Sequence, residues 1–381
     1  MPSANPTTSF IYSHEQSQHV LSPTHPMRPI RLMHMHELMC SVGLLDSESI
    51  ATESPRLATD DEIAKFHDSD YIEVVKAIDA GAIVPAMHQF GFGPGDNPPR
   101  PGMFRHATLA AGGVMLAAER VLNGQTKNAF VPAGGMHHHA MSDRASGFGI
   151  FNDAVIAIKH LIDQGLRVFY VDIDVHHGDG VQAGLYDTER AMTVSIHESG
   201  QWLFPGTGNP DETGTGDGDG YSVNIPLAPY TDDELWHQAF DAVVPDLARA
   251  FDADLIFTQL GIDTHRNDPL AHLSLTTQGH NLAVQKFARL AEELNIPWIS
   301  VGGGGYDMTA VARAWTMDLA TMADQALPDE IPDTYTSLSN MPTFRDQGEY
   351  RIDPDIRFEI SNHNQLAINA IRNQIFPKFG L

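Results

Sequence analysis

The sequence predicts an α/β protein in which a central parallel sheet carries helices on both faces. Short apolar segments rich in β-branched and aromatic residues alternate with longer segments of helical periodicity along most of the chain. The short segments end at Gly, Pro, Asp or His, which is typical of strands that run into turns. The length of 381 residues suits one large α/β unit, so we expect a single-domain fold.

The predicted strands and helices follow one another along the chain. The strands cover residues 128–131, 167–174, 192–197, 221–225, 255–260 and 298–301. The helices cover residues 106–122, 152–164, 232–251, 276–294 and 309–322. Asn152 is expected to cap the second helix, because an Asn side chain can accept a first-turn N–H. Helices between successive strands favour a parallel sheet, and such sheets bind ligands beyond the carboxyl ends of their strands.

The two ends of the chain show weaker patterns. Residues 1–30 are polar and contain His and Pro, so we interpret them as a lead-in to the strands and helices that follow. After residue 325 the chain becomes rich in Pro and Asp. We therefore expect one domain over residues 1–325, with residues 326–381 as an extension packed on its surface.

The charge of the chain excludes several kinds of partner. There are 49 acidic and 23 basic residues, a formal net charge of -26, and this surface repels phosphate backbones and anionic membranes. We expect neither nucleic-acid nor membrane binding, although cationic substrates would be attracted. No run of about eighteen apolar residues and no signal peptide is found, which favours the cytoplasm. Cys40 is the single cysteine, so neither an intramolecular disulfide nor a cysteine-based zinc site is expected.

The strand that ends in Asp-Ile-Asp-Val-His carries the strongest chemical signal. Asp172, Asp174 and His176 are two residues apart, so they face the same side of an extended strand. Buried charges of this kind need a partner, and no Lys or Arg is nearby. Imidazole with carboxylates suits Zn²⁺, and a monovalent cation could bind beneath on carboxylate and backbone oxygens.

A second strand supplies a further carboxylate. Asp263 follows the apolar segment 255–260 and a glycine. Alone it would be weak evidence, because Asp commonly begins turns. With Asp174 and His176 it gives three protein ligands and leaves a position for water, the pattern of a catalytic zinc.

Three consecutive histidines follow a third strand. His137, His138 and His139 come after a Gly-Gly turn, and a neutral imidazole near a metal can accept a proton from water. Asp172 and Asp179 are the candidate carboxylates that would orient the imidazoles.

A four-glycine turn follows the last predicted strand. Residues 302–305 lead to Tyr306, whose O–H could stabilise a developing oxyanion. A structural tyrosine is the alternative. No Gly-Lys-Ser/Thr follows, so a phosphate-binding loop is not favoured, and close approach of the backbone to a ligand or side chain explains the glycines better.

Together these motifs resemble the zinc-dependent histone deacetylase superfamily, which includes class I enzymes, acetoin-utilization-type deacetylases and acetylpolyamine amidohydrolases. The resemblance covers about residues 10–325, and the acetoin-utilization branch is the most similar. The motifs that carry it are residues 24–31 (THPMRPIR), 65–71 (KFHDSDY), 134–140 (GGMHHHA), 145–148 (ASGF), 172–179 (DIDVHHGD), 204–208 (FPGTG), 261–263 (GID), 302–306 (GGGGY) and 312–316 (ARAWT).

The resemblance implies an arginase–deacetylase fold and a set of roles. Zinc would bind to Asp174, His176 and Asp263, and Asp172 and Asp179 would orient the paired histidines. The residues expected to contact substrate are Phe148 and Phe204 as channel walls, Leu270 at the rim, Asp96 at the mouth, and Gly147 and Gly304. Potassium or sodium sites would use Asp172, Asp174, His176, Ser195 and Ile196 for one ion, and Leu185, Thr188, Ala191 and Tyr221 for another.

The chain departs from the family pattern in two places. Relatives usually carry two histidines before Ala140, so the pair is either His138 with His139 or His137 with His138. The first choice keeps the family spacing to Phe148, and we prefer it. Gly149 stands where many relatives carry Cys, which removes a thiol that no proposed role requires.

The predicted activity is hydrolysis of the acetyl amide of N6-acetyl-lysine in proteins, with His138 as the expected base and Tyr306 as the oxyanion stabiliser. An acetylated acyl-CoA synthetase is the partner that the acetoin-utilization branch implies, and an oligomer is compatible with the sequence. The alternatives are an acetylpolyamine amidohydrolase, a ureohydrolase of the arginase type, which would need further Asp ligands, and a pseudo-enzyme that senses acetyl groups. Zinc and iron both suit the site.

Overall fold

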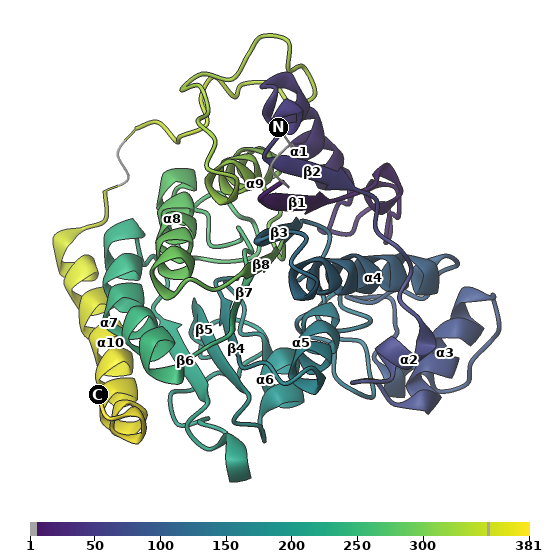
Figure 1. Ribbon diagram of the computed structural model, residues 1–381, viewed down its shortest axis with the longest axis horizontal. Helices are drawn as coiled ribbons and strands as arrows, with labels where there is room; N and C mark the ends of the chain where they lie inside the picture. Colours follow the sequence, from purple (N-terminus) through teal and green to yellow (C-terminus); the bar gives the residue numbers. More distant parts are fainter. Residues whose placement is uncertain (1–5, 349–350) are drawn as a thin grey trace.

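A single eight-stranded parallel sheet organises the molecule (Figure 1). The computed structural model describes residues 6–348 and 351–381. The strand order is β2-β1-β3-β8-β7-β4-β5-β6, and every neighbouring pair is parallel. The strands are β1 Thr8–Ile11, β2 Ile50–Glu53, β3 Asn128–Val131, β4 Val168–Asp172, β5 Ala191–Glu198, β6 Ser222–Leu227, β7 Leu255–Gln259 and β8 Trp298–Val301. The predicted fold class is confirmed.

Helices cover both faces of the sheet (Figure 1). The helices are α1 Ile30–Ser41, α2 Asp60–Ile63, α3 Ser69–Asp79, α4 Met103–Leu122, α5 Asp153–Asp163, α6 Asp179–Leu185, α7 Asp233–Phe251, α8 Thr277–Leu294, α9 Met308–Met322 and α10 Pro354–Gln374. Asn152 caps α5 as predicted, because its side chain accepts the Val155 N–H at 3.1 Å. Of the described helices, none is long and apolar enough to cross a membrane.

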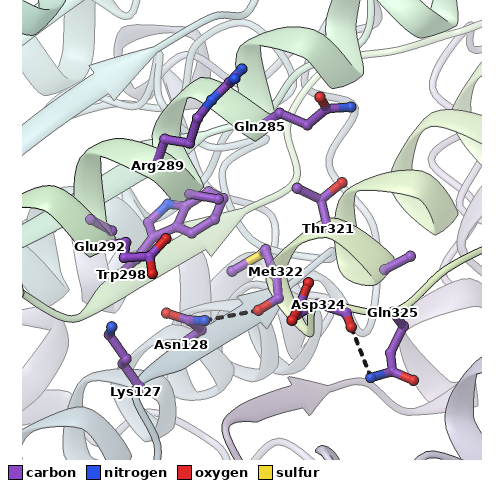
Figure 2. A pocket seen from close by; sticks show the side chains of 13 residues that line it. Lys127, Asn128, Gln285, Arg289, Glu292, Trp298, Thr321, Met322, Asp324 and Gln325 are labelled. Atoms are coloured by element: carbon purple, nitrogen blue, oxygen red, sulfur yellow. Dashed lines mark hydrogen bonds between the residues drawn. The ribbon is translucent and has the colours of Figure 1, made fainter.

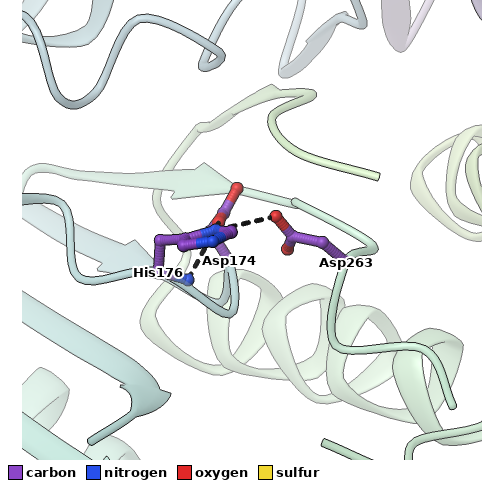
Figure 3. Close-up of side chains that lie close together, drawn as sticks. All are labelled: Asp174, His176 and Asp263. Carbon is purple, nitrogen blue, oxygen red and sulfur yellow. Dashed lines mark hydrogen bonds and ion pairs between the residues drawn. The ribbon is translucent and has the colours of Figure 1, made fainter. Parts of the chain in front are cut away.

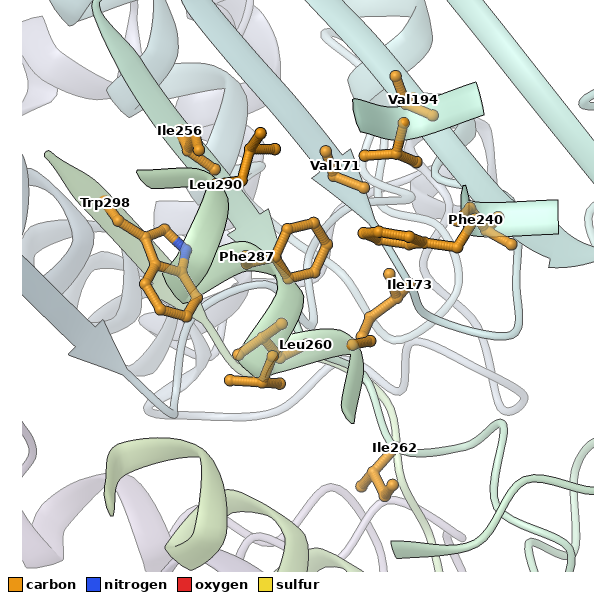
Figure 4. Packing of buried hydrophobic residues seen from close by; sticks show 14 of the residues in the cluster. Val171, Ile173, Val194, Phe240, Ile256, Leu260, Ile262, Phe287, Leu290 and Trp298 are labelled. Atoms are coloured by element: carbon orange, nitrogen blue, oxygen red, sulfur yellow. The ribbon is translucent and has the colours of Figure 1, made fainter. Parts of the chain in front are cut away.

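Alternating residues of each strand pack on opposite faces, which is why the central strands are mostly apolar. In β4, Phe169 and Val171 belong to the core beneath α7 and α8, whereas Val168 and Tyr170 belong to the core beneath α4 and α5. Figure 4 shows the first of these cores, in which Val171 lies near the Phe240 ring of α7. Both faces are therefore buried, and the polar residues concentrate at the strand ends.

The start of the described chain contains a strand that the sequence analysis did not predict. The expected lead-in, residues 1–30, contains β1, a buried strand that pairs with β2 and β3. The four residues of β1 are too few to show a period, so the strand was indistinguishable from a loop. The expectation was wrong for this segment.

The C-terminal residues pack on the same body. Helix α10 lies along α7 and β6, and the buried Asn364 amide accepts the Ala228 N–H at 2.9 Å. Between α9 and α10, Tyr335, Met341 and Phe344 join a small apolar cluster with Leu38 of α1. The segment after residue 325 is thus partly helical and makes buried contacts.

Candidate active site

The predicted site residues gather where the central strands end. In the sheet, β3, β8, β7 and β4 are consecutive neighbours, and their carboxyl ends lie at one edge. The histidine run follows β3, the glycine turn follows β8, Asp263 follows β7 and Asp174 follows β4. Residues that are as much as 170 positions apart, such as Met136 and Tyr306, therefore come into contact.

Asp174, His176 and Asp263 form a compact buried group (Figure 3). One ligand atom from each residue lies within 4.8 Å of the others. His176 Nδ1 is 3.2 Å from Asp174 Oδ1 and 3.1 Å from Asp263 Oδ2, so the imidazole stands between the two carboxylates. Two carboxylates and one imidazole that face a common point form a donor set that suits a divalent ion.

The electrostatics of the group fit a cation. Burial and the nearby Asp174 charge raise the pKa of Asp263 to about 6. Burial would lower the pKa of His176, but its hydrogen bonds to Asp174 and Asp263 outweigh this and raise it to about 10. Among the described residues, the ion pairs of both carboxylates are with imidazoles and not with Lys or Arg. The two carboxylates thus favour positive charge between them, which the proton of His176 supplies here and which a metal ion could supply instead.

Neighbouring groups hold the carboxylates in place. Asp174 Oδ2 accepts the Gln259 side-chain N–H at 2.7 Å and the Gly304 N–H at 2.7 Å. Asp263 Oδ1 accepts the Val175 N–H at 2.9 Å. A Cβ at Gly304 would lie 1.9 Å from Asp263 Oδ2, which explains why a glycine is needed there. Gly304, predicted to contact substrate, contacts the metal-binding group in the structure.

His138 and His139 form a pair beside this group. His138 Nδ1 lies 2.9 Å from Asp172 Oδ2, and His139 Nδ1 lies 2.7 Å from Asp179 Oδ1. The two ring centroids are 4.0 Å apart. The structure therefore brings together the preferred histidines and the two predicted orienting carboxylates, and each imidazole keeps its other nitrogen for a reacting group.

The two imidazoles have opposite proton affinities. Burial would lower the pKa of His138, but the carboxylates of Asp172 and Asp174 outweigh this and raise it to about 9. Burial and the adjacent His138 lower the pKa of His139 to about 4. At neutral pH His138 therefore carries a second ring proton and is cationic. His139 is neutral at this pH and can accept a proton.

His137 has a different environment. Its Nδ1 accepts the backbone N–H groups of Ile150 at 3.0 Å and Phe151 at 3.3 Å. Burial lowers the pKa of His137 to about 4, which keeps the ring neutral. The hydrogen bonds of this third histidine are therefore with the segment before α5 and not with Asp172 or Asp179.

Aromatic rings stand on both sides of the group. The Phe148 ring contacts Tyr306 edge-on at a centroid distance of 5.9 Å, and the Phe204 ring contacts His139 at 5.0 Å. Phe204 also faces His176 at 6.4 Å and is 45% exposed, so it lies at the surface end of the site. The two phenylalanines therefore lie against His139 and Tyr306, and their role as channel walls stays a prediction.

Tyr306 is fixed through its backbone. Its N–H donates to Asp268 Oδ2 at 2.7 Å, and the other oxygen of Asp268 accepts the Leu270 N–H at 3.0 Å. Burial and the charges of Asp263 and Asp174 raise the pKa of the Tyr306 phenol well above its ordinary value. The phenol therefore keeps its proton and can donate it in a hydrogen bond.

The remaining predicted substrate contacts are near the mouth. Asp96 is exposed, and with Gly147 it borders a hollow of about 290 Å³. A Cβ at Gly147 would lie 2.3 Å from the His139 ring, so this glycine allows close packing behind the histidine pair. Leu270 is half-buried, next to the Asp268 that holds Tyr306.

The predicted monovalent-cation residues occupy two regions. Asp172 pairs in register with Ser195 on β5, and Ile196 follows it. Leu185, Thr188 and Ala191 lie between the end of α6 and the start of β5, and the Tyr221 carbonyl accepts the Thr193 N–H at 2.8 Å. The residues of each predicted set are thus close in the fold.

Several residues that support the site had no assigned role in the sequence. Asp153 accepts the Gly135 N–H at 3.0 Å, and Asn152 donates to the His138 carbonyl at 3.3 Å and the Ala140 carbonyl at 3.1 Å, so α5 holds the histidine run. Gln259 was visible as a polar residue at the end of an apolar strand, and its place at the common edge could have revealed it. Asp268 gave no such signal, because Asp is common in loops.

A separate cavity lies away from this edge (Figure 2). It has a volume of about 560 Å³, and its wall includes Lys127 and Asn128 before and at the start of β3, and Trp298 at the start of β8. It is therefore at the amino ends of these strands. None of the predicted site residues lines it, so this cavity is distinct from the candidate active site.

Known proteins share both the sequence and the fold. The histone deacetylase domain profile matches residues 25–322. The acetoin utilization protein AcuC of Bacillus subtilis is 41% identical over 315 residues, which are 80% of this chain and 79% of that protein. Human histone deacetylase 1 is 35% identical over 364 residues, which are 95% of this chain and 71% of that protein.

The solved structures agree. A histone deacetylase homologue from Aquifex aeolicus is 27% identical, has a TM-score of 0.83, and matches 95% of this chain and 100% of its own. A structure of a homologue complexed with SAHA gives a TM-score of 0.82 with the same coverage and identity. On the profile match, the identities and the shared fold, the chain belongs to the histone deacetylase family and is a deacetylase, a hydrolase of amide bonds.

Proposed function

We propose that this protein hydrolyses the acetyl amide of N6-acetyl-lysine in proteins, with one zinc ion held by Asp174, His176 and Asp263. The observation that carries the proposal is the buried group of these three side chains beside the carboxylate-bound pair His138 and His139. When bound, zinc would supply Lewis-acid polarisation of the amide carbonyl and of water. Iron(II) is the alternative ion for the same donor set.

The chain's own residues account for the remaining requirements. Phe148 and Phe204 flank the apolar stem of the acetyl-lysine, and their rings disfavour a charged, unacetylated amine. The Tyr306 O–H donates a hydrogen bond to the carbonyl oxygen as negative charge develops there. Asp96 is exposed, and its carboxylate would accept backbone N–H groups of the substrate.

The histidine pair moves the protons of the reaction. Water forms a bond to the acetyl carbon, and one imidazole of the His138–His139 pair takes its proton. The bond from the acetyl carbon to the lysine nitrogen then breaks, and the pair delivers a proton to that nitrogen. The products are acetate and lysine. Asp172 and Asp179 keep the rings oriented throughout.

Three further assignments belong to the proposal. Potassium or sodium would bind near Asp172 and Ser195, and near Thr188 and Tyr221. An acetylated acyl-CoA synthetase is the protein partner suggested by the similarity to the acetoin utilization protein. The charge of -26 and the expected cytoplasmic location fit a protein substrate presented in solution.

The competing substrate class is acetylpolyamines, which the acidic charge would attract. The deciding experiment compares kcat/KM of the zinc-loaded protein on acetyl-lysine peptides and on acetylputrescine. A preference for the peptides supports the proposal. A preference for acetylputrescine, or hydrolysis of neither, overturns it.

A further inference from the structure

Asp346 comes after all the motifs of the site in the sequence, in the segment between α9 and α10 that passes beside α8 (Figure 1). It is beyond residues 25–322, which the family profile matches. Its side chain is only 6% exposed and accepts three hydrogen bonds: from His265 Nε2 at 2.7 Å, the Thr277 N–H at 3.0 Å and Arg313 at 2.7 Å. A buried carboxylate with this many donors is a fixed point of the structure.

The contact with His265 is directional. The Asn267 backbone N–H can only donate, and it points to His265 Nδ1 at 3.3 Å. The neutral ring therefore carries its proton on Nε2 and donates it to Asp346 Oδ2. His265 is fully buried, so both of its nitrogens depend on these two partners.

The loop that contains His265 also contains residues of the candidate active site. His265 is two residues after Asp263, and its carbonyl accepts the Asp268 N–H at 2.8 Å. Asp268 in turn holds the backbone of Tyr306 and of Leu270. A shift of His265 would thus displace a proposed zinc ligand on one side and the anchor of the proposed oxyanion donor on the other.

The segment around Asp346 is itself anchored. The Asp346 N–H donates to Thr277 Oγ1 at 3.2 Å and to Gln278 Oε1 at 2.9 Å, at the start of α8. The Phe344 carbonyl accepts the Thr277 O–H at 2.9 Å. Asp346 therefore presents its carboxylate to His265 from a rigid position, as a partner that orients a site must.

We propose that Asp346 is a positioning residue of the deacetylase site: through His265 it sets the loop of residues 263–270, and so the places of Asp263 and Tyr306. The proposal rests on the proposed function for the identity of the reaction. A merely structural ion pair with Arg313 would stabilise the fold without affecting the metal or the turnover.

The test uses full-length protein with Asp346→Asn and with His265→Gln, singly and together. Asp329→Asn is the matched control, because this carboxylate is exposed on the same segment. Three quantities are measured: zinc affinity by chelator competition, kcat and KM on an acetyl-lysine peptide, and the urea midpoint of unfolding. We expect each single variant to lose about 10- to 100-fold in zinc affinity, with a fall in kcat and a KM within about threefold.

The double variant separates the explanations. If Asp346 acts through His265, the double variant loses no more than the single variants, because both remove the same interaction. Unchanged zinc affinity and kcat, with only a lower urea midpoint, would overturn the proposal. Should Asp346→Asn fail to fold, His265→Gln decides alone, since it leaves the bonds of Asp346 to Thr277 and Arg313. If the wild type hydrolyses no peptide, the proposed function fails, while the zinc affinities still decide the role of Asp346.

Discussion

Asp172 and His138 are joined by a hydrogen bond of 2.9 Å in which the carboxylate is completely buried. The same oxygen accepts the Tyr170 O–H at 2.6 Å, so two donors converge on it. The carboxylate therefore fixes one proton of His138 on Nδ1, so that only Nε2 can give or take a proton in the reaction.

The first prediction follows from this bond. Asp172→Asn places an amide against two donors, which reorients the His138 ring or changes its tautomer. We expect kcat to fall by about 10- to 100-fold or more, with a smaller change in KM. Steady-state kinetics on an acetyl-lysine peptide measures this. Asp241→Asn, an exposed carboxylate on α7, is the control, and equal losses in both variants would contradict the assignment.

The histidine run provides a second prediction. His138→Ala and His139→Ala should each lower kcat by about 100-fold or more, because each removes a proton-transfer group. His137→Asn keeps an acceptor for the Ile150 N–H and should stay within a few-fold of wild type. His137→Ala leaves that N–H buried without a partner and should lower the free energy of unfolding by about 1–3 kcal/mol. A His137→Asn enzyme as inactive as His138→Ala would show that the pair is misassigned.

Metal removal is the third prediction. Chelation should abolish turnover, one equivalent of zinc per chain should restore it, and the melting temperature should rise with zinc because the ion binds only the folded chain. Asp263→Asn should show little of this rise. Differential scanning fluorimetry with metal analysis measures both effects. A wild-type melting temperature that does not change when zinc is added would argue against the proposed zinc site.

Gly304 gives the fourth prediction. In Gly304→Ala the new Cβ would lie 1.9 Å from Asp263 Oδ2, so the carboxylate must move. We expect zinc affinity to fall by about tenfold or more, measured by competition with a chelator. Gly95→Ala is the matched control, because a Cβ there meets nothing within 4 Å. Equal zinc affinities in the two variants would be the contrary result.

The fifth prediction concerns acid stability. Burial lowers the pKa of His67 to about 3, and the ring is held neutral because Nε2 accepts the Asn152 N–H at 2.8 Å. Between pH 6.5 and 3 the unfolded chain binds a proton at His67 that the folded chain does not, so stability falls as the pH falls through this window. The slope for one proton is about 1.4 kcal/mol per pH unit.

Urea unfolding of wild type and His67→Gln at several pH values between about 7 and 5 measures this slope. As the pH falls, the free energy of unfolding of the variant should decrease less steeply than that of the wild type. The difference in slope should be at most about 1.4 kcal/mol per pH unit, the value for one proton. His88→Gln, at an exposed position, is the control for the substitution itself. Parallel curves for wild type and His67→Gln would refute the prediction.

The sequence predicted the centre of the fold well and its margins poorly. The apolar strands before Asp174, Asp263 and Tyr306 were recognisable because both faces of the sheet are buried, and polar residues at their ends marked the common edge. Helix α10 was not predicted, since its apolar residues do not keep to one face: Ile356, Phe358 and Leu366 are exposed, which blurs the helical period. Asp353 before Pro354 is a helix-start signal that could have indicated it.

Contacts between side chains distant in sequence were the part that no pattern could supply. Asp346 and His265 are 81 residues apart, and nothing in either segment identifies the other. The same holds for Asp268 and Tyr306, because a loop Asp has many ordinary uses. The pairing of His138 with Asp172 was predictable only after the histidine run and the strand had been placed at one edge.

The place of β8 in the sheet bears on biosynthesis. This strand, Trp298–Val301, lies between β3 and β7 and is the last one along the chain. A growing polypeptide can pair β1 with β2 and β3, and can form the row β7-β4-β5-β6, but no strand pairing joins the two groups until residue 301 has left the ribosome. Between the synthesis of β5 and that of β8 the nascent chain therefore presents two incomplete sheets with open edges, and these edges are the surfaces that a chaperone would protect.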